Sequence, residues 1–305
     1  YTTLFRSTGE LADLPEAQIV TSYTDCISNV INQIEADYGH GEGHGIGGLM
    51  VYNDYLIGTI YRWHNCGEPL PVSHFYTMRT NYDKSNTTGL LSINAGELNG
   101  LTAPAGAMAG YMVQLPSEWQ NKLGYKALTG SLFGEEIGGR NNRCSNGTAA
   151  FGFNPEEFLS ASEIDGEQFM YYSLDYPMDS VFFNKAHNIN GMAFIEYSDN
   201  GEQKPAIVYG VRYGNPPYFW DSGYRATSYD AKLYFFNPDD LLAVKNGTIK
   251  QYELIPYYTI NLSQYFYNTE CKLKSMTYNP NTKNLYIVEE KANDVYPVVH
   301  VFQVQ

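Results

Sequence analysis

The chain has 305 residues and a formal net charge of −14, from 33 acidic and 19 basic residues. This acidity argues against nucleic acid or an anionic membrane surface as the main partner, because both require a positively charged protein face. The sequence contains no run of 18 apolar residues, which predicts that no transmembrane helix is present. The 28 tyrosines, 15 phenylalanines, 28 glycines and 14 prolines are typical of a β-rich protein, since aromatic residues favour strands and Gly and Pro mark turns.

The first 45 residues predict a tail and a single helix. Residues 1–20 show no sustained hydrophobic period, whereas Thr24 to Ala36 carries apolar residues at the i, i+3, i+4, i+7 spacing of a helix. The chain starts at Tyr1 rather than Met. This start indicates either a removed signal peptide or a longer precursor.

Beyond this segment the pattern is that of strands. Residues 49–52 and 55–61 are joined by Asn53 and Asp54, a signal for a β-hairpin. Residues 191–197 and 204–212 flank an Asp-Asn-Gly turn and predict a second hairpin.

One short motif recurs along the chain. Residues 151–159 read FGFNPEEFL, residues 234–242 read YFFNPDDLL, and residues 276–282 give a looser copy, MTYNPNT. The motif asparagines stand at positions 154, 237 and 279, and the second spacing of 42 residues matches the length of one four-stranded propeller blade. The third copy lies in a predicted hairpin turn, which leaves open that this spacing is accidental.

Three prolines predict short helical turns after strands. Pro116, Pro155 and Pro238 each stand where proline opens a helix. Acidic pairs follow the last two, at the position where carboxylates stabilise a helix N-terminus. We therefore interpret these acids as helix-capping groups rather than catalytic ones.

On these motifs, residues 46–305 resemble secreted β-propeller repeat proteins in general, without pointing to one characterised family. The resemblance implies an all-β fold with a single propeller of about five to seven four-stranded blades, preceded by the tail and short helix of residues 1–45. It also implies that the C-terminal strand 298–304 pairs with a strand near the N-terminus. A pair of β-sandwiches is the alternative architecture.

Sequons and cysteines predict a secreted protein. The N-glycosylation acceptors are Asn86, Asn146, Asn246 and Asn261. The cysteines are Cys26, Cys66, Cys144 and Cys271. Their even number and wide spacing, with no C-x-x-C pair, favour two disulfides over a zinc site. We expect Cys26 to pair with Cys66 and Cys144 with Cys271, while other pairings and free thiols remain open.

Two segments carry candidate binding residues. His40 and His44 in the sequence HGEGH could contribute to a metal site, although a flexible Gly-rich loop explains the same pattern. Tyr218, Trp220 and Asp221 form an aromatic loop suited to stacking on a sugar ring. No cofactor is expected, and binding of calcium or zinc is left open.

Candidate catalytic groups are sparse. Asp54, Asp221 and Glu42 are the acids that a propeller glycosidase could use, but the sequence does not assign them to a reaction. We therefore predict a non-enzymatic protein: an extracellular, N-glycosylated propeller acting as a binding or structural module. Its partners would be other copies of itself or extracellular glycans and proteins, and its N-terminal tail could join copies into a filament. The alternatives are a carbohydrate-active enzyme of the glycoside hydrolase type and a sugar-binding lectin.

Overall fold

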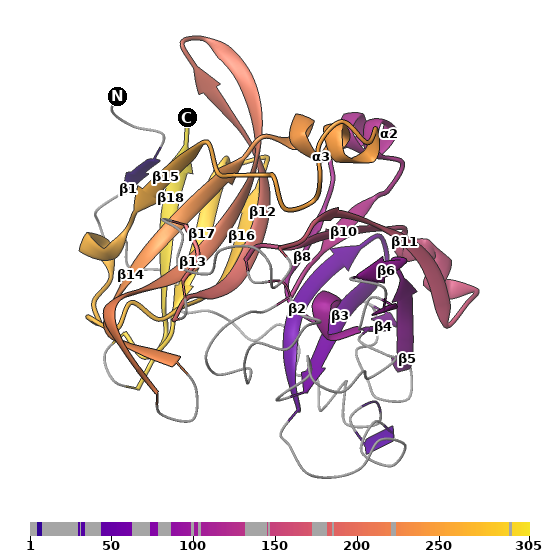
Figure 1. Cartoon of the computed structure of the whole chain (residues 1–305), viewed down its shortest axis with the longest axis horizontal. Coiled ribbons are helices and arrows are strands. Elements are labelled where there is room, and N and C mark those ends of the chain that lie inside the picture. The colour runs from indigo at the N-terminus through magenta and orange to yellow at the C-terminus, as the bar shows by residue number, and fades with distance from the viewer. Residues whose placement is uncertain are drawn as a thin grey trace.

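The computed structural model describes residues 5–7, 30, 32–33, 44–62, 74–78, 87–98, 101–102, 105–131, 145, 147–172, 182–184, 186–220, 224–292 and 295–305. Within them the chain forms one eight-stranded sheet, two four-stranded sheets and one two-stranded sheet (Figure 1). The helical elements are short: α2 (Ser117–Leu123), α3 (Pro238–Lys245), and the 3-10 turns η2 (Ala105–Met108), η4 (Pro155–Leu159) and η5 (Ser263–Tyr265). The predicted all-β class is confirmed.

The eight-stranded sheet has the order β2-β3-β4-β5-β11-β10-β9-β8. Its strands are β2 (His44–Tyr52), β3 (Tyr55–Arg62), β4 (His74–Met78), β5 (Thr87–Asn94), β11 (Glu163–Met170), β10 (Ala150–Phe153), β9 (Ala127–Thr129) and β8 (Met112–Gln114). All neighbours are antiparallel except β5 and β11, which pair in parallel. The small sheet consists of β6 (Glu97–Leu98) and β7 (Leu101–Thr102).

The eight-stranded sheet curls until its two outermost strands approach each other. The Thr59 hydroxyl, buried on β3, accepts a hydrogen bond from the Gly48 amide at 2.7 Å and donates one to the Gly110 carbonyl at 2.6 Å. A Cβ atom at Gly47 would stand only 1.9 Å from the Ala109 carbonyl oxygen, so this close approach requires glycine. Since no ladder of hydrogen bonds joins β2 to β8 among the described residues, the sheet is curled but not a closed barrel.

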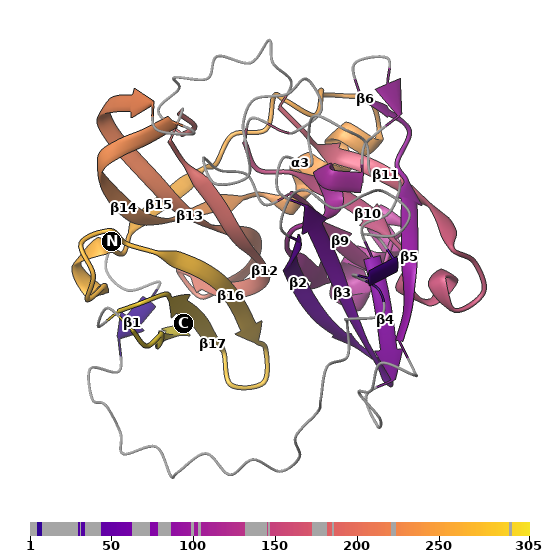
Figure 2. The same cartoon turned by 90° about the horizontal axis from the view of Figure 1, so that it is seen from below.

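The second half of the chain forms two facing four-stranded sheets. One contains β12 (Asn188–Asp199), β13 (Glu202–Trp220), β14 (Tyr224–Phe236) and β15 (Tyr258–Asn261), in that order. The other has the order β1 (Phe5–Ser7), β18 (Val298–Val304), β17 (Asn284–Glu289) and β16 (Leu273–Asn279). Fully buried side chains from both sheets, including Ile195, Val208, Phe235, Leu285 and Phe302, share one core. Figure 2 shows β16 and β17 beneath the longer strands of the first sheet.

The described strands do not form the successive blades of a propeller. The two close copies of the Asn-Pro motif follow β10 and β14, which belong to different sheets. The motif marks a local step from strand to helical turn, and this step recurs without any repeat of the surrounding sheet. The predicted sandwich alternative describes the half formed by β12 to β18, and the loose motif copy does lie in a hairpin turn, between β16 and β17.

Other local predictions are confirmed. Helical turns start at or directly after Pro116, Pro155 and Pro238. Both predicted hairpins form, β2 with β3 and β12 with β13. The C-terminal strand β18 pairs with the N-terminal strand β1, although at the edge of a sandwich sheet instead of in a propeller ring.

The N-terminal prediction is described only in part. Val30, Asn32 and Gln33 are helical, and the remainder of the predicted helix lies outside the described residues. The boundary near residue 45 stays a prediction. None of the helices in the described part of the chain has the length and apolar character needed to cross a membrane.

Candidate functional site

Of the five predicted ligand-binding and metal-binding residues, only Tyr218 is described with its side chain. His40 and Asp221 lie outside the described residues, and for His44 and Trp220 only the backbone strand is described. Tyr218 lies on β13 and donates a long hydrogen bond of 3.5 Å to the Gly214 carbonyl. No three His, Cys, Asp or Glu side chains gather into a metal site among the residues that the structure describes. The sugar loop and the His40 and His44 site therefore stay predictions.

Two of the four predicted glycosylation sites can be located. Asn246 is exposed and ends α3. Asn261 is exposed on β15, where its side-chain oxygen accepts a hydrogen bond from the Ser263 amide at 2.8 Å. Asn86 and Asn146 lie outside the described residues. The two that are described are at the surface, as glycan attachment requires.

Cys271 is a buried free thiol in this structure. Burial raises the pKa of this thiol, so it is a poor nucleophile at neutral pH. Cys26, Cys66 and Cys144 lie outside the described residues, so the predicted pairing of Cys144 with Cys271 stays a prediction.

Of the candidate catalytic acids, Asp54 is described, whereas Glu42 and Asp221 lie outside the described residues. Asp54 is exposed in the β2–β3 turn beside Asn53, whose φ of 50° is a turn conformation. Asp240 has a raised pKa because it is partly buried and lies next to Asp239. Asp239 and Asp240 both occupy the first turn of α3, which agrees with the predicted capping role.

The N-terminal strand forms the outer edge of one sandwich sheet. Phe5, Arg6 and Ser7 pair with Val304, Gln303 and Phe302 of β18. β1 therefore covers only the last three residues of a seven-residue strand. On that side of the sheet, residues 298–301 have no strand partner among the described residues. Among the described residues, β1 therefore occupies part of the β18 edge, and an edge strand of this kind can accept an added strand.

Exposed tyrosines border this acceptor edge. The Tyr265 ring lies 5.5 Å from the ring of Phe302, and the Tyr267 ring stacks 6.0 Å from His300 on the same strand. Their side chains are 41% and 63% exposed. The buried carboxylate of Glu289 fixes this segment, because it accepts hydrogen bonds from the amides of Tyr267 and Asn268 and contacts His300 at 2.8 Å.

Tyrosine side chains of the described residues lie both at the surface and in the core. Tyr265 and Tyr267 lie at the surface, as a binding role requires. Tyr171 and Tyr172 are buried and serve the core.

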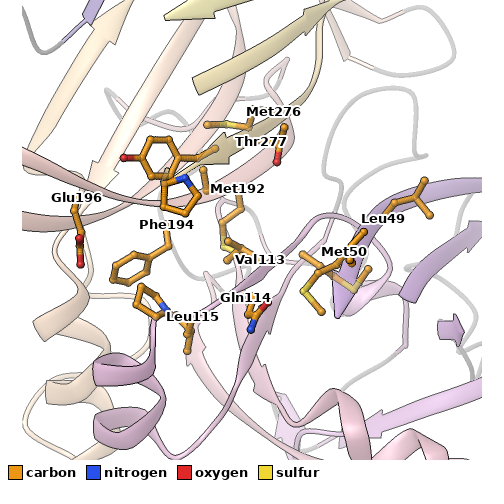
Figure 3. Close-up of a pocket in the computed structure, with 16 residues that line it drawn as sticks. Leu49, Met50, Val113, Gln114, Leu115, Met192, Phe194, Glu196, Met276 and Thr277 are labelled. Carbon is orange, nitrogen blue, oxygen red and sulfur yellow. The ribbon is translucent and has the colours of Figure 1, made fainter. Parts of the chain in front are cut away.

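A groove of about 570 Å³ opens where the eight-stranded sheet meets the sandwich. Figure 3 shows Met192 and Met276 on one wall and Met50 on the facing wall. Met112 completes a set of four methionines, each from a different strand. Sequence reasoning missed this groove, because the four residues have no common spacing and meet only through the packing of distant strands.

Sheet edges rather than sheet faces line the groove. The contributing strands β2, β8, β12 and β16 are each the last strand of their sheet. Each supplies consecutive residues: 49–51, 112–114, 192–194 and 276–278. Since successive side chains point to opposite faces of a strand, a lining of consecutive residues means that the strand backbone faces the groove. Glu196, at one end, is the only charged side chain of this lining (Figure 3).

Comparison of the chain with protein-family models, with curated proteins and with solved structures found no match. The features that bear on its function are the β18 edge and the groove lined by four edge strands.

Proposed function

We propose that this chain is a secreted, N-glycosylated binding and assembly module whose copies join by strand addition, with β1 of one molecule pairing with β18 of the next. The observation that carries the proposal is the position of β1. It is a three-residue strand at the very edge of its sheet, and its only strand partner among the described residues is β18.

Chain length permits the exchange. The 22 residues from 8 to 29 separate β1 from Val30, which is buried against Gly89 of β5, and an extended segment of that length would span up to about 75 Å. β1 can therefore reach the β18 of a neighbour as well as its own. Pairing within one molecule and pairing between molecules would form the same backbone hydrogen bonds, which is the usual condition for domain swapping.

The surroundings of the edge also favour an interface. Tyrosine is enriched at protein interfaces, since it supplies a large contact area at a low cost in side-chain entropy. Tyr265 and Tyr267 lie beside β18, and the Glu289 carboxylate holds the backbone of Tyr267 in place. They would contact whatever molecule donates the strand.

Cross-linking distinguishes the two pairings. Arg6 and Gln303 are direct partners in the register, so a chain with Arg6→Cys and Gln303→Cys should form a disulfide on mild oxidation. Exchange between molecules predicts a ladder of covalent oligomers on a non-reducing gel. The two single variants control for the native cysteines. Cross-linked monomer alone, at every protein concentration, would contradict the proposal.

The carbohydrate-active alternative has less support. Glycoside hydrolysis uses two carboxylates about 5 to 10 Å apart. Glu196 is the only carboxylate among the described residues that line the groove. The lectin alternative depends on Tyr218, Trp220 and Asp221, and an assay of binding to immobilised glycans with Trp220→Ala tests it directly.

A further inference from the structure

We propose that the methionine-lined groove is a second strand-accepting site, independent of β1, which binds an extended peptide segment of another protein. The peptide would carry apolar side chains on one face and a basic residue at the end nearest Glu196. Three features of the groove lead to this occupant.

The first feature is that four edge strands line the groove without pairing with one another among the described residues. Within the described part of the chain, no backbone hydrogen bond connects residues 49–51, 112–114, 192–194 or 276–278 to another of these edges. An edge strand offers its unpaired N–H and C=O groups to any extended chain that can approach it. A small apolar molecule would leave those groups without partners, whereas a peptide strand would satisfy them.

The second feature is the absence of the usual protection. Proteins commonly guard edge strands with lysine, proline or inward-pointing charges. Here the prolines stand at the ends of the lining, at Pro116 and Pro280, and the described lining contains no lysine. Its other residues are apolar apart from Gln114, Thr277, Tyr278 and Glu196. Leu49 and Val51 on β2 are 53% and 49% exposed, although they belong to a strand with a free edge.

The third feature is the chemistry of the lining. Met50, Met112 and Met192 are buried members of the two adjacent cores, so they give the groove an apolar lining. Methionine side chains are flexible and polarisable, which lets such a lining adjust to an apolar occupant. Glu196 provides one carboxylate at one end. Together with a net charge of −14, it favours a peptide that carries a basic residue.

Glycines bring the walls of the groove together at two places. Gly47 and Gly48 of β2 lie against Ala109 and Gly110, just before β8. β12 and β16 approach closely at Gly191, where an added Cβ would lie 2.9 Å from the Met276 amide nitrogen.

The test uses the full chain and the fluorescein-labelled peptide KVTVTVT, with binding followed by fluorescence anisotropy. Leu49→Lys and Thr277→Lys place a charge on opposite walls, and each should weaken binding at least about tenfold. Ile255→Lys is the matched control, because Ile255 is 56% exposed and lies outside the groove lining. It should bind the peptide as the unmodified chain does.

Two further peptides separate strand addition from simple apolar binding. A version with N-methyl groups on alternate residues keeps the side chains but loses backbone donors, and its affinity should fall at least about tenfold. A version with norleucine in place of lysine should bind the unmodified chain more weakly than the lysine peptide does. The Glu196→Gln variant should bind the two peptides with equal affinity. Equal affinity of the N-methylated peptide, or no binding of any peptide, would overturn the proposal.

Discussion

The hydroxyl of Thr59 holds the two ends of the curled sheet together. It is fully buried and bridges the Gly48 amide of β2 and the Gly110 carbonyl before β8. Replacing it by the nearly isosteric valine would leave both backbone groups without this partner. We expect Thr59→Val to lower the free energy of unfolding by about 2 kcal/mol, measured by urea denaturation.

The matched control is Thr59→Ser, which keeps the hydroxyl and removes one methyl group. Its cost should be only about 1 kcal/mol. If valine proved as stable as threonine, the hydroxyl bridge would not contribute to holding the edges.

A second residue-scale prediction concerns pH. Burial alone would raise the pKa of Glu156, but hydrogen bonds from Lys126 and Tyr52 outweigh it and lower the pKa below its ordinary value of 4.5. The unfolded chain therefore takes up a proton before the folded chain does as the pH falls. The stability from this contact is present above pH 4.5 and is lost as the pH drops through the lowered pKa.

Thermal unfolding between pH 7 and pH 3 measures this effect. The difference in stability between the unmodified chain and Glu156→Gln should shrink as the pH falls. It should stay below about 1 kcal/mol, because the Glu156 and Lys126 side chains are 35% and 42% exposed. A difference that grows on acidification would contradict the assignment.

At the scale of elements, the two copies of the Asn-Pro motif differ in detail. The Asn237 side chain accepts a hydrogen bond from the Asp239 amide and caps α3. The Asn154 side chain makes no capping bond to its own turn and instead accepts one from the Lys126 amide of the neighbouring segment. We expect Asn237→Ala to destabilise the fold by about 1 kcal/mol in urea denaturation.

Asn237→Ser is the control for this prediction, since serine is also a good capping residue and should restore most of the lost stability. Equal losses for alanine and serine would show that the side chain acts through some contact other than the cap.

Elements were predictable from the sequence wherever their cause is local. The Asn53-Asp54 and Asn200-Gly201 turns fix their hairpins through residues with positive φ. Proline stands at the start of α2, α3 and η4. The parallel pairing of β5 with β11 has no such local cause. It places Ser92 beside Glu163, and the whole α2 region lies between them in the chain. A repeat length read from three motif copies therefore predicted the wrong sheet order.

At the scale of the whole molecule, the pairing of β1 with β18 was predicted from the sequence, whereas the methionine-lined groove was not. The pairing of the chain ends was anticipated only through the resemblance to propellers, which often close their ring by pairing strands from both termini, and it occurs here in a sandwich sheet. The groove was not anticipated, because it exists only where Met50, Met112, Met192 and Met276 are brought together by three sheets. No segment of the sequence carries a signal for it.

The assembly proposal makes a prediction for the complete chain. Deleting residues 1–20 removes β1 and leaves the whole of β18 as an open edge. If copies join through β1, the truncated chain should elute as a monomer on size-exclusion chromatography where the full chain forms oligomers.

A synthetic peptide of residues 1–12 should then bind the open edge and raise the melting temperature of the truncated chain, because a ligand that binds only the folded state stabilises it. A scrambled peptide of the same composition controls for nonspecific binding. An unchanged oligomeric state after the deletion would refute assembly through β1, whereas peptide binding without any oligomers of the full chain would show that β1 pairs only within its own molecule.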